Sequence, residues 1–230
     1  MEKLSPIQLL QSSSLPMLVQ EEMEKMILQG DIVVGGRLNE ADLAQHFGIS
    51  RGPIREAFRG LEESGLVRQE KNRGAFVREI SVTEADEIYD VRDALEELIG
   101  RKLAANITPA QLAELQQQVE QIEQVGVSQD VTRYHLLNLQ FHDTLVSFTG
   151  NRKLIAVYRK LTKELLLFRR RGLAAGGGML VSSDEHRAIY EAIAARDTDA
   201  AGNMLRRHSE LSRARMHRAV ENQTAAATTA

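Results

Sequence analysis

Three arginines at helical spacing are the first residues of this sequence whose chemistry suggests a ligand. Arg51, Arg55 and Arg59 lie four residues apart, so on a helix their guanidinium groups would form one stripe. Guanidinium groups pair with phosphate and with base edges in the major groove of DNA. A single arginine is more often a solvated surface residue, so the argument for DNA rests on the elements that carry the stripe.

Those elements are predicted to be a helix-turn-helix over residues 43–67. Leu43 and Phe47 lie one helical turn apart, and Gly48 can adopt the positive φ that ends a helix. Ser50 is a good N-cap for a second helix, and Pro53 suits its first turn. The apolar residues of that second helix are spaced to bury one face: Ile54, Ala57, Phe58 and Leu61. A helix, a glycine turn and a basic second helix are typical of a motif that enters the major groove.

A basic hairpin is predicted directly after these helices. Two strand-like pieces, residues 66–69 and 75–78, flank the sequence Lys-Asn-Arg-Gly at 71–74, which is typical of a β-turn. Such a hairpin is a wing, and it could place Arg73 and the backbone of Gly74 against DNA. Turn, capped helix and basic hairpin together predict a winged helix-turn-helix.

The stretch RLNEADLAQHFGISRGPIREAFRGLEESGLV, followed by RGAFV, resembles the winged-helix domain of the GntR family of bacterial transcription regulators. Its most specific part, SRGPIREAFRGLEESGL, is close to the family pattern S-R-x-P-[VI]-R-E-A-L-x-x-L-E-x-x-G-L. The resemblance implies that Arg51 and Arg55 read base edges, that Gly74 is the wing-tip glycine, and that Arg37 touches phosphate. Ala41 stands where several family members carry another arginine, so this position offers no guanidinium for a base contact.

Length and composition limit the number of domains and the class of protein. The chain has 230 residues, enough for two domains with separate cores, and only 4% aromatic residues, which suits packed helices. It has no cysteine, which excludes disulfides and thiolate metal sites. No membrane span or signal peptide is recognisable, so we expect a cytoplasmic protein with no membrane contact. Residues 37–78 hold eight basic and six acidic residues, or +2, against −3 for the whole chain, so the basic charge lies in the winged helix.

The predicted fold is mostly α, with an N-terminal winged helix-turn-helix and a C-terminal all-α bundle of about six helices. The predicted layout is a flexible tail at 1–14, the DNA-binding domain at 15–80, an effector-binding and dimerisation domain at 81–221, and a flexible tail at 222–230. Within the bundle, Thr108 and Gln111 form a capping box around a proline, and Thr83 with Asp86 form an approximate one. Gly176–Gly178 predicts a flexible break between helices.

The helical half also carries a candidate metal site. Asn138 and His142 lie four residues apart, on one face of a helix. The stretch NLQFHDTLVSFTGN around them resembles the D-x-x-F-H-x-x-L…G-N motif of the FCD ligand-binding domain, found in the FadR-type branch of the GntR family. His186 and His208 resemble the second and third histidines of that domain. The resemblance implies that these four positions hold a divalent metal inside the bundle.

Three imidazoles without a thiolate would suit zinc, nickel or another first-row divalent ion, with coordination positions left open. Any one histidine is more often an ordinary core or surface residue, and we read His46, His135 and His217 in that way. Asn138 departs from the usual aspartate. Its amide oxygen could coordinate but carries no charge, so we expect weaker metal affinity and a stronger pull on an anionic effector.

Arg92 is the candidate contact for that effector. In YDVRDALEEL it resembles an arginine that often faces the effector in this domain, and a guanidinium matches a carboxylate with two hydrogen bonds. The alternative is that Arg92 pairs with Glu96 on its own helix face. Tyr89 lies three residues earlier on a similar face and is a second candidate for the effector site.

The leading hypothesis is a ligand-responsive transcription regulator, most often a repressor in this family. A homodimer is expected, because two recognition helices are needed to read a palindromic operator. A small metabolite carboxylate would complete the metal coordination and change the affinity for DNA. One alternative is a DNA-binding helical protein with structural histidines and no effector. Another is a metal-dependent enzyme, which lacks support because no H-E-x-x-H motif or placed general base is present.

Overall fold

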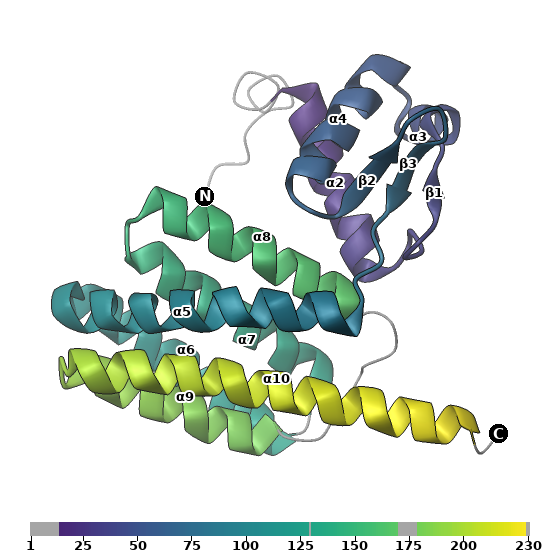
Figure 1. Ribbon diagram of the computed structural model, residues 1–230. Coiled ribbons are helices and arrows are strands. Elements are labelled where there is room, and N and C mark those ends of the chain that lie inside the picture. Colours follow the sequence, from purple (N-terminus) through teal and green to yellow (C-terminus); the bar gives the residue numbers. More distant parts are fainter. Residues whose placement is uncertain (1–13, 129, 170–178, 229–230) are drawn as a thin grey trace. The chain divides into compact units, whose positions relative to one another are not determined.

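The computed structural model describes residues 14–128, 130–169 and 179–228. Residues 1–13 of the predicted N-terminal tail therefore lie outside the described residues, and so does the predicted break at Gly176–Gly178. The chain divides into two compact units, one of residues 1–81 with 162–172 and one of residues 82–161 with 173–230 (Figure 1).

The N-terminal unit is a winged helix. Its helices and strands, in chain order, are α2 (Leu15–Gln29), β1 (Arg37–Leu38), α3 (Glu40–Phe47), α4 (Arg51–Glu63), β2 (Val67–Glu70) and β3 (Gly74–Val77). The three strands form an antiparallel sheet in the order β1-β3-β2, in which Glu70 pairs with Gly74 next to the turn. The sheet therefore includes the predicted hairpin and a short third strand from the start of the motif.

Local signals explain the turn between α3 and α4. The Asn39 side chain accepts a hydrogen bond of 2.9 Å from the Ala41 N–H and so caps α3. Gly48 ends this helix with a φ of 66°, as predicted from its freedom to adopt that conformation. Ser50 stands at the N-cap of α4, as predicted, although its hydroxyl makes no capping hydrogen bond. The four predicted apolar residues of α4 are all buried.

The helical unit is built from six helices within the described residues, as expected. They are α5 (Val82–Asn106), α6 (Pro109–Ser128), α7 (Val131–Phe148), α8 (Arg152–Arg169), α9 (Met179–Ala194) and α10 (Thr198–Thr228). The α8 residues up to Leu161 belong to this unit. Its core includes Leu103, Leu115, Phe141 and Ile189, each at most 1% exposed. None of the described helices combines the length and hydrophobicity that crossing a membrane requires.

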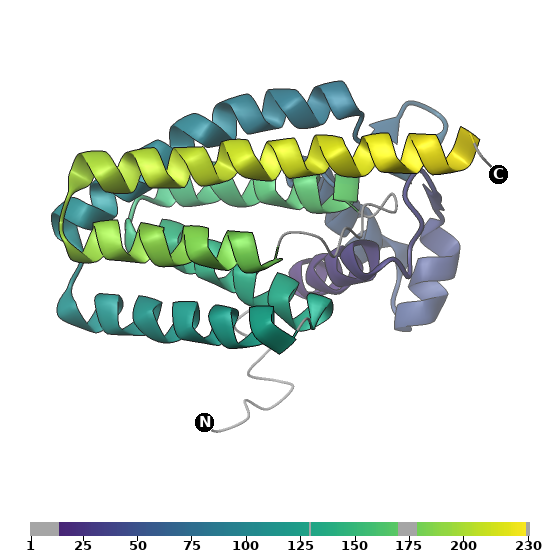
Figure 2. The same cartoon turned by 90° about the horizontal axis from the view of Figure 1, so that it is seen from below.

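Helices α5 and α10 run side by side along the bundle (Figures 1 and 2). They approach closely because α5 has a glycine at the contact. A Cβ placed on Gly100 would lie 2.4 Å from the carbonyl oxygen of Ala201, so no larger residue fits without moving a helix. This packing brings the middle of α5 against the helix that carries His208.

The helix ends confirm one prediction and correct two. Thr108 and Gln111 form the predicted capping box, with the Thr108 N–H donating to Gln111 Oε1 at 3.0 Å. The box of Thr83 with Asp86 was wrong, because α5 already begins at Val82 and Asp86 accepts a 2.8 Å hydrogen bond from Arg213 instead. The tail predicted at 222–230 is helical up to Thr228, since its alanines favour helix and neither glycine nor proline interrupts it.

Candidate functional site

The arginine stripe of α4 is exposed, as DNA contact requires. Arg51, Arg55 and Arg59 all lie on the solvent side of the helix, opposite its buried apolar face. Arg55 is also restrained, because its Nε donates a 2.7 Å hydrogen bond to Glu40 Oε2 on α3. The turn between the two helices therefore places an acidic side chain beside the predicted base-reading arginine.

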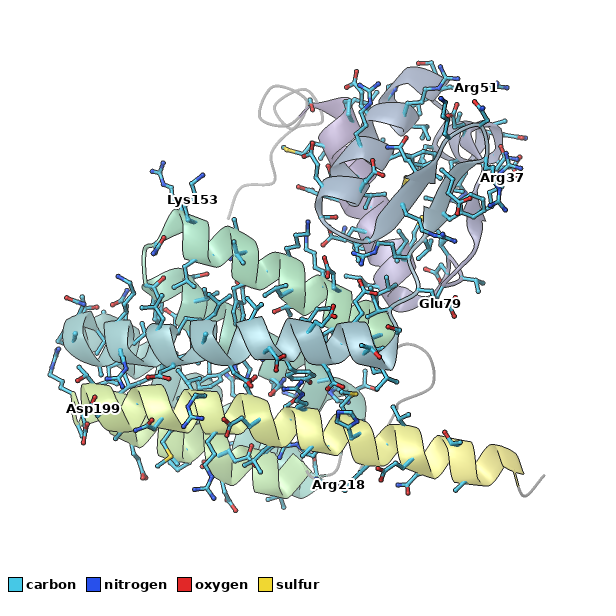
Figure 3. The ribbon with its side chains drawn as sticks, viewed as in Figure 1. Arg37, Arg51, Glu79, Lys153, Asp199 and Arg218 are labelled. Carbon is cyan, nitrogen blue, oxygen red and sulfur yellow. The ribbon has the colours of Figure 1, made fainter. Side chains whose placement is uncertain are left out.

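The wing gathers the other predicted DNA contacts. Gly74 has a φ of 99°, and a Cβ placed on it would lie 3.4 Å from Nε of Arg37. Arg37 is thus packed against the wing glycine, and both Arg37 and Arg51 extend outward from the N-terminal unit (Figure 3). Arg73 forms a 2.6 Å ion pair with Glu70. Glu70 and Glu40 were missed from the sequence, since nothing in their spacing marks an acidic residue as the partner of a DNA-binding arginine.

In the helical unit, the three predicted histidines meet. His142 on α7, His186 on α9 and His208 on α10 are buried, and each offers a ring nitrogen within 4.8 Å of the other two. Nε2 of His142 and Nε2 of His208 are 3.1 Å apart. Three imidazoles from three helices converge on one point, which is the arrangement that a tetrahedral or octahedral metal needs on one side.

His186 is the strongest indication of a missing partner. It is fully buried, and neither of its ring nitrogens has a hydrogen-bond partner among the described residues. Burial, with the nearby charges of His208 and Arg215, holds the pKa of His186 well below its ordinary value. The ring is therefore neutral and keeps a free lone pair, which is the form that binds metal. Leaving such a group unpaired costs free energy that a bound ion would recover.

A buried ion pair orients His208. Glu185 Oε2 lies 2.6 Å from His208 Nδ1, and Arg215 holds the same carboxylate with two hydrogen bonds of 2.8 and 2.9 Å. Although its burial acts in the opposite direction, the hydrogen bonds from His208 and Arg215 lower the pKa of Glu185 to about 2. The charged carboxylate favours a proton on Nδ1, so the Nε2 lone pair of His208 faces the other histidines, as in carboxylate–histidine–metal sites.

Asn138 lies one turn before His142 on α7 and is partly buried. It therefore occupies the same face of this helix as His142. Its role as a fourth ligand stays a prediction.

Arg92 is paired with its own helix. Its Nη2 donates to Glu96 Oε1 at 2.9 Å, which is the alternative that the sequence left open. The Tyr158 hydroxyl donates to the same oxygen at 2.7 Å, and this oxygen is 3.6 Å from Nδ1 of His142. The other oxygen, Glu96 Oε2, is buried and has no hydrogen-bond partner in the described part of the chain. Arg92 therefore reaches the histidine cluster through Glu96, and its charge is already balanced.

Tyr89 is buried and its hydroxyl lies 3.2 Å from the Ser212 hydroxyl on α10. The guanidinium of Arg92 lies 5.9 Å from the centre of its ring. Glu96 was named from the sequence only as a partner of Arg92, and the residues that sequence reasoning missed are Tyr158, Glu185 and Arg215. Glu185 precedes a predicted ligand, but its contact with His208 depends on how α9 packs on α10.

Comparisons with known proteins agree with this architecture. Residues 87–211 match the FCD domain, and residues 18–77 match the bacterial regulatory proteins of the gntR family. The chain is 32% identical over 181 residues to the uncharacterized HTH-type transcriptional regulator YdhC of Bacillus subtilis, covering 78% of this chain and 81% of that protein. It is 27% identical over 198 residues to the galactonate operon transcriptional repressor of Escherichia coli, covering 77% and 86%.

Solved structures share the fold. A putative GntR transcriptional regulator from Rhodococcus sp. RHA1 is similar with a TM-score of 0.71 at 26% identity, over 89% of this chain and 98% of that one. E. coli McbR/YncC has a TM-score of 0.76 at 22% identity, over 90% and 98%, which is a likeness of fold alone. The helical unit is therefore an FCD domain. Together with the winged helix, these matches show that the chain belongs to the GntR family of bacterial DNA-binding transcription regulators, which are not enzymes.

Proposed function

We propose that this regulator is a repressor of the FadR-type branch that binds a palindromic operator as a homodimer. Its FCD domain holds a divalent metal, zinc or nickel, and a small carboxylate effector that alters operator affinity. The observation that carries the proposal is the convergence of three buried imidazoles, one of which has no hydrogen-bond partner within residues 14–128, 130–169 and 179–228. Relatives named as repressors of the galactonate operon and of D-xylose utilisation support the repressor role.

The metal set proposed for this chain is His142, His186, His208 and the amide oxygen of Asn138. All four donors are neutral, so they leave the charge of a dication uncompensated. The ion would act as a Lewis acid that attracts and orients an anionic group. Positions beyond these four donors stay open for the effector in an octahedral site.

The fixed charges around the histidines favour an anion. Arg92 balances Glu96 in an ion pair of 2.9 Å, and Arg215 balances Glu185 in one of 2.8 Å. The formal charges of these four groups, of which Arg92 and Glu96 are buried and Glu185 and Arg215 are partly buried, therefore cancel. A dication added at the centre would make the site positive in a low-dielectric interior, where an unpaired charge is costly. A carboxylate removes part of that cost, which is why we assign the effector to this chemical class.

The effector can change operator affinity only if it prefers one arrangement of the protein. The three histidines lie on three different helices, so an ion and its carboxylate fix the relative positions of α7, α9 and α10. We propose that this constraint selects the arrangement in which the winged helices of the dimer no longer match the operator. Arg51 and Arg55 read base edges, whereas Arg37, Arg73 and the Gly74 backbone contact the DNA backbone.

A thermal-shift experiment tests the sensor. Protein stripped with a chelator is reloaded with Zn²⁺ or Ni²⁺ and melted with gluconate, galactonate or the neutral polyol sorbitol. Binding to the native state raises the melting temperature, by RT ln(1 + [L]/Kd) in free energy. We expect each metal to stabilise the wild type, a carboxylate to add stability only when metal is present, and sorbitol to add none.

His186→Gln is the informative variant, and His135→Gln, on the exposed side of α7, is its matched control. The first substitution is expected to abolish the metal-dependent shift, and the second to leave it intact. Metal-independent melting of both variants and the wild type would refute the metal site.

The competing function is a DNA-binding regulator with structural histidines and no effector. It is favoured by the 3.1 Å contact between Nε2 of His142 and Nε2 of His208, which a hydrogen-bonded pair would also adopt. That function predicts unchanged operator affinity across a panel of carboxylates, as measured by fluorescence anisotropy with and without metal.

A further inference from the structure

Helix α5 carries an apolar stripe on its solvent side. Val91, Ala94 and Leu98 follow the spacing i, i+3, i+7, which places them on one face. Val91 is 49% exposed and Leu98 is 41% exposed, Ala94 is exposed, and Leu95 is partly buried. Exposed aliphatic residues are ordinary when they are single. Val91, Ala94 and Leu98 form one exposed apolar stripe, and Leu95 at its edge packs against the core of the helical unit.

The other faces of α5 pack against the rest of the helical unit. Tyr89, Arg92 and Glu96 face the interior, and Gly100 packs against α10. Elsewhere in the helical unit, Leu136 on α7 is 64% exposed. Of its neighbours one turn away, Thr132, Arg133 and Gln140 are polar, and the apolar Leu139 is partly buried. The patch on α5 is therefore different in kind from an isolated exposed leucine.

Opposite charges border the apolar stripe at its two ends. Glu87 lies one turn before Val91, and Lys102 lies one turn after Leu98, on the same face of the helix. Glu87 is exposed and Lys102 is partly exposed. In the part of the chain that the structure describes, no ion pair or hydrogen bond is found for the side chain of either residue. Both charges are thus available to a partner.

This order of residues is self-complementary when two such helices run antiparallel. A two-fold axis between Ala94 and Leu95 places Val91 of one helix opposite Leu98 of the other. The same axis places Glu87 opposite Lys102, so both ends of the contact gain an ion pair. A parallel arrangement would instead place Glu87 against Glu87 and Lys102 against Lys102. Isologous contacts between identical subunits have this two-fold character.

We infer that the exposed face of α5, defined by Glu87, Val91, Ala94, Leu98 and Lys102, binds the same face of a second copy of this chain. The inference rests on the homodimer of the proposed function and identifies the surface that forms it. The small side chain of Ala94 at the centre permits the close interaxial distance, about 8–10 Å, at which packed helices meet. The flanking charges set the antiparallel direction and the register.

Sedimentation or light scattering across a concentration series tests the surface. Leu98→Glu places two carboxylates in the apolar centre and is expected to raise the dimer dissociation constant about tenfold or more. Leu136→Glu, the same substitution on the exposed side of α7, is the matched control and is expected to leave it unchanged. Circular dichroism verifies that both variants remain folded.

Charge reversal tests the direction of the contact. Glu87→Lys and Lys102→Glu are each expected to weaken the dimer, because each places like charges opposite one another. The double variant exchanges both partners and is expected to restore the dimer. Restoration would not follow if the two residues merely affected folding or solubility.

A cysteine introduced near the axis gives a separate readout, because the chain has no cysteine of its own. Ala94→Cys is expected to form a covalent dimer under mild oxidation, whereas Leu136→Cys is not. A wild type that stays monomeric at every concentration overturns both the homodimer and this surface. A wild-type dimer that Leu98→Glu leaves intact, and that Ala94→Cys does not cross-link, overturns the surface alone.

Discussion

The contact between Glu40 and Arg55 leads to a prediction about how this regulator distinguishes its operator from other DNA. Glu40→Gln removes the charge that holds the Arg55 guanidinium at 2.7 Å. The two side chains are 34% and 62% exposed, so solvent screens the pair and its contribution to folding is about 0.2–1 kcal/mol. The substitution therefore leaves the fold intact and acts on DNA binding.

Two effects on DNA follow, and they have opposite signs. Ordering a long side chain on binding costs about 0.5–1.5 kcal/mol, so an unrestrained Arg55 is expected to lower operator affinity by about 2- to 13-fold. Removing a carboxylate near the phosphates is expected to raise affinity for non-specific DNA. The ratio of specific to non-specific affinity should therefore fall more than either affinity changes.

The assay is fluorescence anisotropy with an operator obtained by selection and with its single base-pair variants, each over a series of salt concentrations. Glu56→Gln is the matched control, because it removes an equal charge from the exposed side of α4 without breaking an ion pair with Arg55. Arg55→Ala is expected to lose about 1–3 kcal/mol of discrimination at one base pair. An Arg55→Ala loss that is equal for all sequences, or a Glu40→Gln ratio that matches the Glu56→Gln control, would refute the positioning role.

Three further predictions concern the helical unit. Asn138→Asp is expected to raise metal affinity in a calorimetric titration, because it adds a charge next to a dication, and unchanged or weaker affinity would contradict Asn138 as a ligand. Glu123→Gln is expected to cost about 0.2–1 kcal/mol of stability at neutral pH. Its hydrogen bonds to Arg187 lower the pKa of Glu123, so the contribution is present above the ordinary carboxyl pKa and disappears as the pH falls through the lowered one, which urea denaturation at several pH values would detect. Gly100→Ala is expected to destabilise the unit by about 1–3 kcal/mol in the same assay, because the added methyl meets the Ala201 carbonyl, and an unchanged midpoint would contradict the close packing of α5 on α10.

Much of the fold was predictable because its signals are local. The apolar spacing of α4, the glycine that ends α3 and the box of Thr108 with Gln111 each involve residues within about one or two turns of one another. The errors were local too. Thr83 has the right chemistry for a cap, but a hydroxyl can cap only if the helix begins directly after it, and α5 already begins at Val82. The far end of α10 continued because alanine-rich sequence allows helix without requiring it.

The candidate metal site was also predictable only in part. Family resemblance identified His142, His186 and His208 as ligand types on three helices, and the pairing of Arg92 with Glu96 followed from i, i+4 spacing. Packing alone decided that the three imidazoles meet. Packing also gave His208 its carboxylate and left one oxygen of Glu96 buried without a partner among the residues described. These contacts join residues that are distant in sequence, and their side chains meet only where two helices pack against each other. The spacing of residues along the sequence does not specify which helices pack together, so these contacts could not be predicted from it.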